Sequence, residues 1–316
     1  MNRLIIIDGN AILHRAFHAL PPLTAPDGTL VNAVYGFTSM LLRLITDLTP
    51  THIAVTFDRP APTFRKKLYA DYQIKRPKMD EGLVQQIPLV HDVVSAMHVP
   101  IYECDGFEAD DIIGSLCKKY TKNIDQIIIV TGDKDLLQLA TDTIKIYMPT
   151  RGLSEAKLYG PKETIERLGV TPEQIPDYKA LAGDQSDNYP GVPGIGPKTA
   201  IELLTTYISI EELYKHINRT GTKISPRTKE KLIMHKQLAI LSKTLATIKN
   251  DIPIEEPIKP ISLAQFSTHD VVIALQRFGF HSLIKRIQTS TGTEKPTITK
   301  KREGRKKSID EQMSLI

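Results

Sequence analysis

The sequence predicts an α/β protein: a mainly parallel sheet flanked by helices, followed by a smaller helical domain. Two patterns support this prediction. Short runs rich in β-branched residues alternate with helical patterns up to about residue 160. After that point the strand signal fades while helical patterns continue. We therefore expect a sheet domain over residues 1–165, a helical domain over residues 166–288 and a tail over residues 289–316.

Five apolar runs are the expected strands, and their continuous hydrophobicity indicates parallel strands buried on both faces. They span residues 3–7, 52–57, 99–104, 126–131 and 144–148. Helices with regular apolar spacing lie between them, at residues 33–48 and 83–97. Pro88 should kink or interrupt the second of these helices.

Within the helical domain, Thr171 is typical of a helix N-cap because a proline and an acid follow it. The same pattern predicts a helix through the sequence "EQIPDYKALAG". Further helices are expected over residues 197–206, 209–217, 228–242 and 268–287.

The composition favours a cytoplasmic protein with a substantial core. The chain has 316 residues, and 41% of them are hydrophobic. No stretch approaches the roughly 18 apolar residues of a membrane helix, and the apolar run after Met1 is too short for a signal peptide. Cys104 and Cys117 have no histidines at zinc-ligand spacing, so buried reduced thiols are favoured over a disulfide or a zinc site.

Positive charge is concentrated near the C-terminal end. Residues 289–307 contain seven Lys or Arg and two Glu in a Ser/Thr/Gly-rich context, which predicts a solvated, disordered tail. This tail either holds DNA through counterion release or only stays solvated. The preceding residues are weakly basic in sum, so a nucleic-acid surface there must come from local segregation of charge.

Carboxylates gather on five segments, several of them where an expected strand ends. In an open parallel sheet, the carboxyl ends of the strands deliver side chains to one ligand-binding rim. A single Asp after a strand is more often a turn or cap residue, but here the pattern repeats. The nine acids, called the acid network below, are Asp8, Asp58, Glu108, Asp110, Asp111, Asp133, Asp135, Asp184 and Asp187.

Convergence of these carboxylates would need cations. Mutual repulsion in a partly desolvated cleft costs several kcal/mol or keeps some of the acids protonated. Oxygen ligands without Cys or His select hard divalent ions, Mg²⁺ or Mn²⁺. Two such ions about 4 Å apart form the arrangement that activates a water and stabilises the leaving oxygen in phosphodiester hydrolysis.

The sequence "PGVPGIGPKTA" fits the turn of a helix-hairpin-helix motif. Gly194 and Gly196 permit a tight reversal, and Ile195 should point into the core. The amides that open the next helix, beside Lys198 and Thr199, should face outward and receive a phosphate. Such a turn binds DNA through its backbone without reading the base sequence.

Taken together, these motifs resemble the 5′ nuclease domains of bacterial DNA polymerase I, members of the flap endonuclease family. The strings "IDGNAILHRAFHAL", "FEADDIIG", "TGDKDLLQL" and "GDQSDNYPGVPGIGPKTA" carry the likeness, in consistent order over about residues 1–288. The resemblance implies a PIN-like nuclease core and a helix-three-turn-helix DNA-binding domain with a potassium ion at the hairpin. It also implies two-metal 5′→3′ exonuclease and flap endonuclease activity in replication and repair.

The same resemblance assigns roles and partners. Asp184 and Asp187 match the metal-site pair contributed from the hairpin side. The implied substrates are DNA with 5′ flaps, nicks or gaps and RNA–DNA primers, bound by a monomer on the bacterial nucleoid. The acids that match the catalytic and metal-site acids of the core are Asp8, Asp58, Glu108, Asp110, Asp111, Asp133 and Asp135.

Residues 59–78 combine charge with aromatic rings: seven Lys or Arg, one Asp and three aromatic residues. A solvated helix face explains this composition by itself, but beside the acid network a channel for single-stranded DNA is the better interpretation. The segment resembles the helical arch of the family, expected here over about residues 60–95. Arg65, Tyr72 and Arg76 match its DNA-binding positions, and Arg76 also matches a catalytic one.

One position departs from the family pattern. The resemblance implies a lysine between Tyr72 and Arg76. This sequence has Gln73 at that position, which we still expect to be one of the DNA-binding residues. On a regular helix a lysine there would share a face with Arg76 beside the attacked phosphate, whereas Gln73 can only hydrogen-bond. The sequence therefore predicts slower turnover than is usual for the family, and faster single-turnover cleavage by Gln73→Lys.

The final residues resemble the short peptide that docks bacterial replication proteins onto the sliding clamp. They are Gln312, Met313, Ser314, Leu315 and Ile316. Two other interpretations of the whole chain stay open. One is a non-catalytic branched-DNA-binding protein, against which nine intact acids argue; the other is the amino-terminal part of a longer DNA polymerase.

Overall fold

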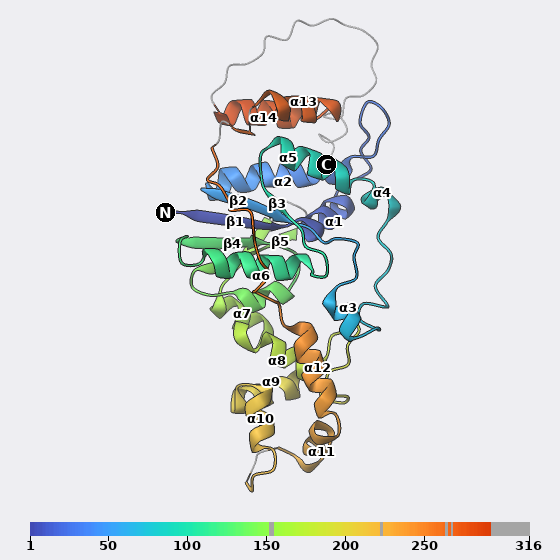
Figure 1. The fold of residues 1–316 in the computed structure, drawn as a ribbon, viewed down its shortest axis with the longest axis vertical. Coiled ribbons are helices and arrows are strands. Elements are labelled where there is room, and N and C mark those ends of the chain that lie inside the picture. The colour runs from blue at the N-terminus through green and yellow to red at the C-terminus, as the bar shows by residue number, and fades with distance from the viewer. Residues whose placement is uncertain (152–154, 222–223, 263–264, 267, 292–316) are drawn as a thin grey trace, which may run out of the picture.

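A computed structural model describes residues 1–151, 155–221, 224–262, 265–266 and 268–291 (Figure 1). The predicted clamp-binding end and most of the predicted tail lie outside the described residues. The strands are β1 (Arg3–Asp8), β2 (His52–Thr56), β3 (Ile101–Tyr102), β4 (Gln126–Val130), β5 (Ile144–Arg151) and β6 (Glu155–Tyr159).

Helices surround this sheet and continue beyond it. The 3₁₀ helices are η1 (Asp135–Leu139) and η2 (Pro172–Gln174). The helices up to the end of the sheet region are α1 (Gly9–Ala19), α2 (Asn32–Leu48), α3 (Phe64–Leu68), α4 (Glu81–Val84), α5 (Ile87–Ala96), α6 (Ala109–Tyr120) and α7 (Pro161–Leu168). The later ones are α8 (Ile175–Ala182), α9 (Pro197–Tyr207), α10 (Ile210–His216), α11 (Pro226–Met234), α12 (Lys236–Ala246), α13 (His269–Arg277) and α14 (His281–Thr291).

The sheet confirms the predicted α/β class. Its strand order is β3-β2-β1-β4-β5-β6, and every pairing from β3 to β5 is parallel. Strand β6 was not expected; it pairs antiparallel with β5 at the edge of the sheet. Its side chains are mostly exposed, so it lacks the apolar run that marks the inner strands.

Alternate residues of β1 face two different cores. Ile5 and Ile7 pack with α1, α2 and α5 on one side of the sheet, whereas Leu4 and Ile6 pack with α6 on the other. In Figure 1 the helices α2 and α5 lie above the sheet, and α6 and α7 lie below it. The apolar core below continues into the helical region, where α8 packs against α9 and α12.

Three predicted helices are divided in the structure. Pro88 lies in the first turn of α5 and separates it from α4, as expected from its missing N–H. The helix expected over residues 228–242 breaks at His235, whose backbone leaves the helical region (φ −109°, ψ 24°). The helix expected over residues 268–287 breaks at Gly279, which has a positive φ of 73°.

The last two helices return to the sheet. Helix α13 packs on α5 and α14 packs on α2, so both lie over the helices that cover the upper face of the sheet in Figure 1. Val271, Leu275 and Phe280 belong to the same apolar core as Ile5 and Ile7. The expected domain boundaries at residues 165 and 288 assign α13 and α14 to the helical domain, whereas both helices pack against α5 and α2 of the sheet domain.

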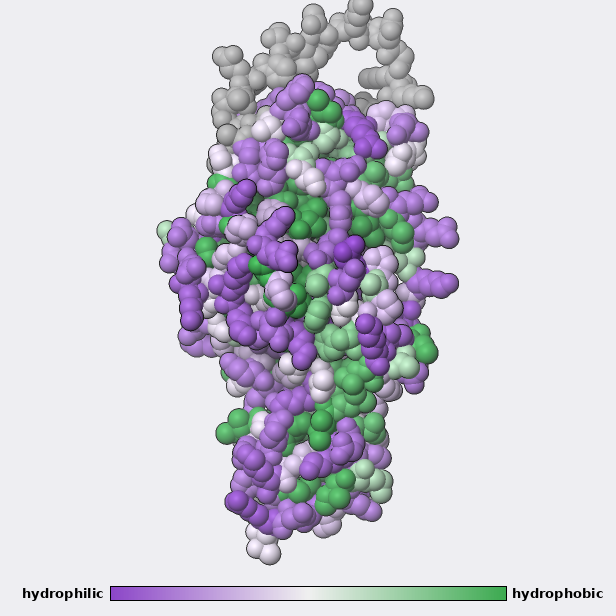
Figure 2. All heavy atoms as spheres, in the orientation of Figure 1, coloured by the Kyte–Doolittle hydropathy of each residue, from purple (hydrophilic) through white to green (hydrophobic). Residues whose placement is uncertain are grey.

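The surface has mixed polarity. Figure 2 shows hydrophilic side chains spread over most of the visible face, with smaller hydrophobic areas between them. Among the described residues, none of the helices combines the length and hydrophobicity needed to cross a bilayer.

Candidate active site

The carboxyl ends of the parallel strands bring the first acids together. Asp8 ends β1 and caps α1, where it accepts hydrogen bonds from the Ala11 amide (3.0 Å) and the Thr131 hydroxyl (2.7 Å). Asp58 follows β2 and accepts a hydrogen bond from the Ala109 amide at the start of α6 (2.7 Å). The rim predicted from the strand ends is therefore formed, and it is joined to the first turn of α6.

Burial and repulsion act on the acids of this rim. Burial raises the pKa of Asp8 to about 7, and the neighbouring charges of Asp58 and Asp133 act in the same direction. Burial also raises the pKa of Asp110, and Asp133, Asp8 and Glu108 reinforce it. Each of these carboxylates is harder to ionise because the others are near.

The same causes act further along the network. Burial raises the pKa of Glu108 to about 7, with Asp58 and Asp187 adding to the effect. Asp133 and Asp58 are exposed side chains, but desolvation by the surrounding protein raises the pKa of Asp133 to about 6, with the charge of Asp135 adding to it, and also raises the pKa of Asp58. Burial likewise raises the pKa of Asp135. The charges of Asp111, Asp184 and Asp187 also act on acids of this group, so all nine predicted acids belong to one electrostatic network, which hard divalent cations would stabilise.

One part of the network has oxygen atoms close enough to share an ion. One oxygen each from Asp135, Asp184 and Asp187 lies within 4.8 Å of the other two. Asp184 and Asp187 belong to a short loop that is closed by reciprocal backbone hydrogen bonds between Asp184 and Tyr189 (2.9 and 3.0 Å). This loop carries the pair from the helical region to the rim of the sheet.

A lysine that sequence reasoning missed lies in this cluster. The Lys179 ammonium on α8 forms ion pairs with Asp135 and Asp184. Burial opposes ionisation of Asp184, but Lys179 and the hydrogen bonds from Ser186 and the Asp187 amide together outweigh it and lower the pKa of that carboxyl. No sequence signal distinguishes Lys179 from an ordinary helix lysine, because its partners come from two other segments.

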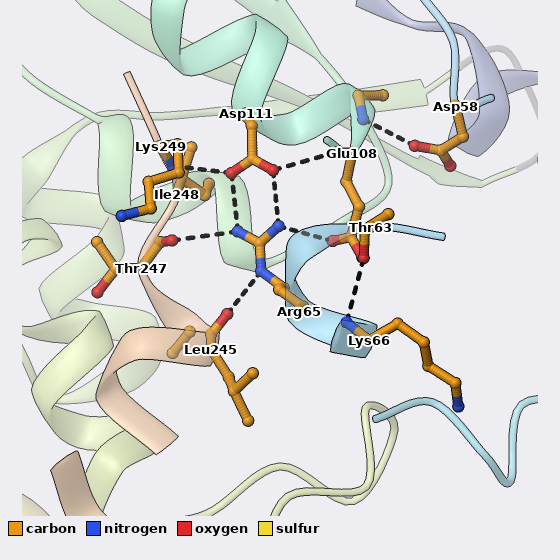
Figure 3. Close-up of polar contacts among 12 residues, drawn as sticks. Asp58, Thr63, Arg65, Lys66, Glu108, Asp111, Leu245, Thr247, Ile248 and Lys249 are labelled. Carbon is orange, nitrogen blue, oxygen red and sulfur yellow. Dashed lines mark hydrogen bonds and ion pairs between the residues drawn. The ribbon is translucent and has the colours of Figure 1, made fainter. Parts of the chain in front are cut away.

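Arg65 is a buried structural residue in this structure, in contrast to the predicted DNA contact (Figure 3). Its Nε donates to the Leu245 carbonyl (2.8 Å), and Nη2 donates to the Thr247 carbonyl (3.1 Å). Nη1 donates to Glu108 (3.1 Å), and both Nη atoms donate to Asp111 (2.7 and 2.8 Å). All five N–H donors of the guanidinium therefore have protein acceptors, and none is left for a phosphate.

Asp111 has the matching structural role. Its side chain is fully buried, and besides Arg65 it accepts hydrogen bonds from the amides of Glu108 (3.1 Å) and Lys249 (2.8 Å). Figure 3 shows these donors arranged around the carboxylate. Four hydrogen bonds occupy its two oxygens, so this geometry does not present Asp111 as the predicted metal ligand.

The predicted arch also differs from a regular helix. Helix α3 ends at Leu68, and residues 70–75 form turns in which Gln73 has a positive φ of 55°. The Gln73 side chain donates to Asp187 Oδ1 (3.0 Å), and its amide donates to the Asp187 carbonyl (2.9 Å). The helical argument for Gln73→Lys therefore does not hold here, because no helix face relates this position to Arg76.

Tyr72 points inward rather than toward solvent. Its ring stacks on Tyr189 (centroids 6.4 Å apart), and its hydroxyl lies within hydrogen-bonding distance of Glu108 (3.2 Å) and Asp187 (3.3 Å). This buried position does not offer the ring to a DNA base. Arg76 is exposed, and its charge opposes the burial that raises the pKa of Asp58.

The hairpin has the expected local geometry. Gly194 has a positive φ of 78°, Ile195 is buried in the core, and Gly196 caps α9. Lys198 is exposed and Thr199 is half-buried in the first turn of α9. An anion could approach these amides from solvent.

Comparisons with known proteins find matches over most of the chain. Residues 3–169 match the family model "5'-3' exonuclease, N-terminal resolvase-like domain", and residues 170–269 match "5'-3' exonuclease, C-terminal SAM fold". The chain is similar to the 5'-3' exonuclease of Aquifex aeolicus, with 36% identity over 287 residues, covering 91% of this chain and 96% of that protein.

Longer relatives and solved structures are also similar. DNA polymerase I of Bacillus subtilis is 40% identical over 285 residues, covering 90% of this chain and 32% of the polymerase. The chain thus spans about a third of the DNA polymerases I that it matches.

Among solved structures, the bacteriophage T5 flap endonuclease in complex with DNA and metal ions has a TM-score of 0.66. It shares 17% identity and covers 92% of this chain and 99% of its own. The catalytic core of Rad2 with DNA substrate has a TM-score of 0.59 and 15% identity, covering 92% of each chain. These two structures share the fold, and the family models together with the Aquifex relative identify the chain as a member of the 5'-3' exonuclease family.

Proposed function

We propose that this chain is a two-metal 5′ nuclease that hydrolyses phosphodiester bonds at 5′ flaps, nicks and gaps and in RNA primers, in DNA replication and repair. The observation that carries the proposal is the acid network. Its members come from distant parts of the sequence, and the charges among them raise the pKa values of Asp8, Asp110 and Asp133. Membership of the 5'-3' exonuclease family agrees with this chemistry.

The residues fit divalent ions. Every candidate ligand is a carboxylate, which suits Mg²⁺ or Mn²⁺, and buried carboxylates with raised pKa values need a nearby positive charge to be ionised at neutral pH. Asp135, Asp184 and Asp187 would hold one ion, and the rim acids Asp8 and Asp110, with Asp133, would hold another. When bound, such ions supply an activated water and stabilise the leaving oxygen.

Other groups of the chain would position DNA. The exposed amides that open α9 would bind a backbone phosphate near Lys198, with a potassium ion at the hairpin carbonyls. The Gly194 carbonyl already accepts a hydrogen bond from the Lys231 ammonium (2.8 Å), so this part of the hairpin faces positive charge. Arg76, which acts electrostatically on Asp58, would orient the scissile phosphate at the rim.

Cleavage of a 5′-labelled flap substrate in Mg²⁺, compared with the same reaction in EDTA, tests the proposal. We expect product only with the metal, and we expect Asp133→Asn to lower the single-turnover rate by about a hundredfold or more. Asp142→Asn is the matched control, because Asp142 is an exposed acid outside the network. Flap binding without cleavage in Mg²⁺ or Mn²⁺ would instead support the non-catalytic DNA-binding alternative.

We also propose that Gln312, Leu315 and Ile316 dock on a sliding clamp. The basis is the sequence pattern at the end of the chain. Deleting residues 312–316 should abolish capture by immobilised clamp and leave flap cleavage unchanged. Undiminished capture of the shortened chain would reject the docking proposal and leave the nuclease proposal intact.

A further inference from the structure

Two halves of the acid network differ in the cations that contact them. Lys179 forms ion pairs with Asp135 and Asp184, and its side chain is only 12% exposed. Among the described ion pairs, no Lys or Arg contacts Asp8, Asp110 or Asp133. The half formed by Asp135, Asp184 and Asp187, called the hairpin-side site below, therefore contains a cation that belongs to the chain.

A divalent ion would need the same oxygens. Mg²⁺ binds oxygens at about 2.0–2.1 Å, so its ligands must surround it closely. The three carboxylates of the hairpin-side site already place oxygens within 4.8 Å of one another. Lys179 donates to Oδ1 of Asp135 and Oδ2 of Asp184. A divalent ion bound to those oxygens would lie at contact distance from the Lys179 ammonium. Because the two positive charges would repel each other, the ion and the ammonium cannot occupy the site together.

We propose that Lys179 is a built-in counter-ion of the hairpin-side site, which holds its carboxylates together until a divalent ion displaces it. The proposal rests on the nuclease function proposed above. It makes Lys179 a positioning residue, which does not touch the reacting phosphate. It also predicts that the two halves of the network bind divalent ions with different affinities, the weaker being the half that contains Lys179.

The displaced ammonium has a potential acceptor nearby. The Tyr189 hydroxyl is buried and has no hydrogen-bond partner among the described residues, which is uncommon for a buried polar atom. Tyr189 is joined to Asp184 by two backbone hydrogen bonds (2.9 and 3.0 Å), and Asp184 is paired with Lys179, so the hydroxyl belongs to the loop that forms the hairpin-side site. A Lys179 ammonium that leaves Asp135 and Asp184 could donate to this hydroxyl without leaving the site.

The main test measures Mn²⁺ binding to the full chain in the absence of DNA, by calorimetry and by electron paramagnetic resonance of free Mn²⁺. Lys179→Met should tighten the weaker class of sites about tenfold and leave the stronger class unchanged. In EDTA it should also lower the midpoint of thermal unfolding, because Asp135 and Asp184 lose their counter-ion. Mn²⁺ should raise that midpoint more in Lys179→Met than in the wild-type chain.

Lys243→Met is the matched control. Lys243 also bridges two carboxylates in the helical region, Asp177 (2.6 Å) and Glu211 (2.7 Å), but these acids are outside the network. We expect this control to leave both classes of Mn²⁺ sites unchanged. Unchanged or weaker Mn²⁺ binding by Lys179→Met, with intact flap cleavage by the wild-type chain, would overturn the counter-ion proposal alone.

Tyr189→Phe gives an independent test that does not remove a charge. Because the hydroxyl has no partner, the variant should fold as stably as wild type in EDTA. It should weaken the low-affinity Mn²⁺ class by about threefold, and this effect should vanish in the Lys179→Met background. An equal effect in both backgrounds would show that the hydroxyl does not receive Lys179. Absence of both Mn²⁺ classes from the wild-type chain would reject the nuclease proposal itself.

Discussion

Among the described residues, the acid network is contacted by two cationic side chains, Arg65 and Lys179, which differ in exposure and in the number of hydrogen bonds that hold them. The Arg65 side chain is 3% exposed and donates all five of its N–H groups to fixed acceptors. Lys179 is 12% exposed and contacts two carboxylates through one flexible ammonium. We infer that Arg65 is a permanent structural partner, whereas Lys179 is an exchangeable one.

The comparison explains why neighbouring acids have different tasks. Asp111 is fully buried, and its oxygens are occupied by Arg65 and two amides. Asp110 is adjacent in sequence, but burial raises its pKa, and the charges of Asp133 and Asp8 add to this rise. An acid in the network is thus available as a metal ligand only when its carboxylate oxygens are not already occupied by hydrogen-bond donors of the protein.

The largest expected effect concerns the buried pair. Arg65→Met leaves the Asp111 carboxylate buried without its partner, which should lower the free energy of unfolding by about 4 kcal/mol. Arg277→Met is the control, because Arg277 forms an exposed ion pair with Asp92 and should change stability by less than about 1 kcal/mol. Urea denaturation of both variants measures the difference. Similar losses in the two variants would contradict the structural role of Arg65.

A second experiment separates the adjacent acids. Asp111→Asn should destabilise the protein by about 3 kcal/mol, because its amide cannot accept both bonds from Arg65. Asp110→Asn should instead be neutral or stabilising in EDTA, since it removes a repelled charge. Only Asp110→Asn should therefore lose flap cleavage while remaining folded in Mg²⁺. Equal destabilisation by the two substitutions would refute this division of roles.

The pH dependence of stability gives the smallest expected effect. The pKa of Asp8 is raised from 3.8 to about 7, so the folded chain binds this proton more tightly than the unfolded chain. In EDTA, stability should therefore fall as the pH rises from about 4 to about 7, because the unfolded chain releases this proton before the folded chain does. Saturating Mn²⁺ should reverse the trend, because the ions bind the ionised acids. Urea denaturation at pH 5 and pH 7.5 tests both signs.

Much of the fold is determined locally and was readable from the sequence. Continuous apolar runs predicted the parallel strands because a strand buried on both faces needs no polar residues. Pro88 and the glycines of the hairpin act within a few residues of where they stand, so their effects were also predictable. Strand β6 was missed, because an exposed edge strand has no apolar pattern to recognise.

The acid network has some features that could be predicted from the sequence and others that could not. The sequence by itself determined which carboxylates follow the strands and that a rim of parallel strands would gather them. Only the tertiary structure decided that Asp111 pairs with Arg65 and that Lys179 contacts Asp135 and Asp184. Each of these choices depends on which donors from distant segments fill the space around one carboxylate, and no local pattern along the chain encodes that arrangement.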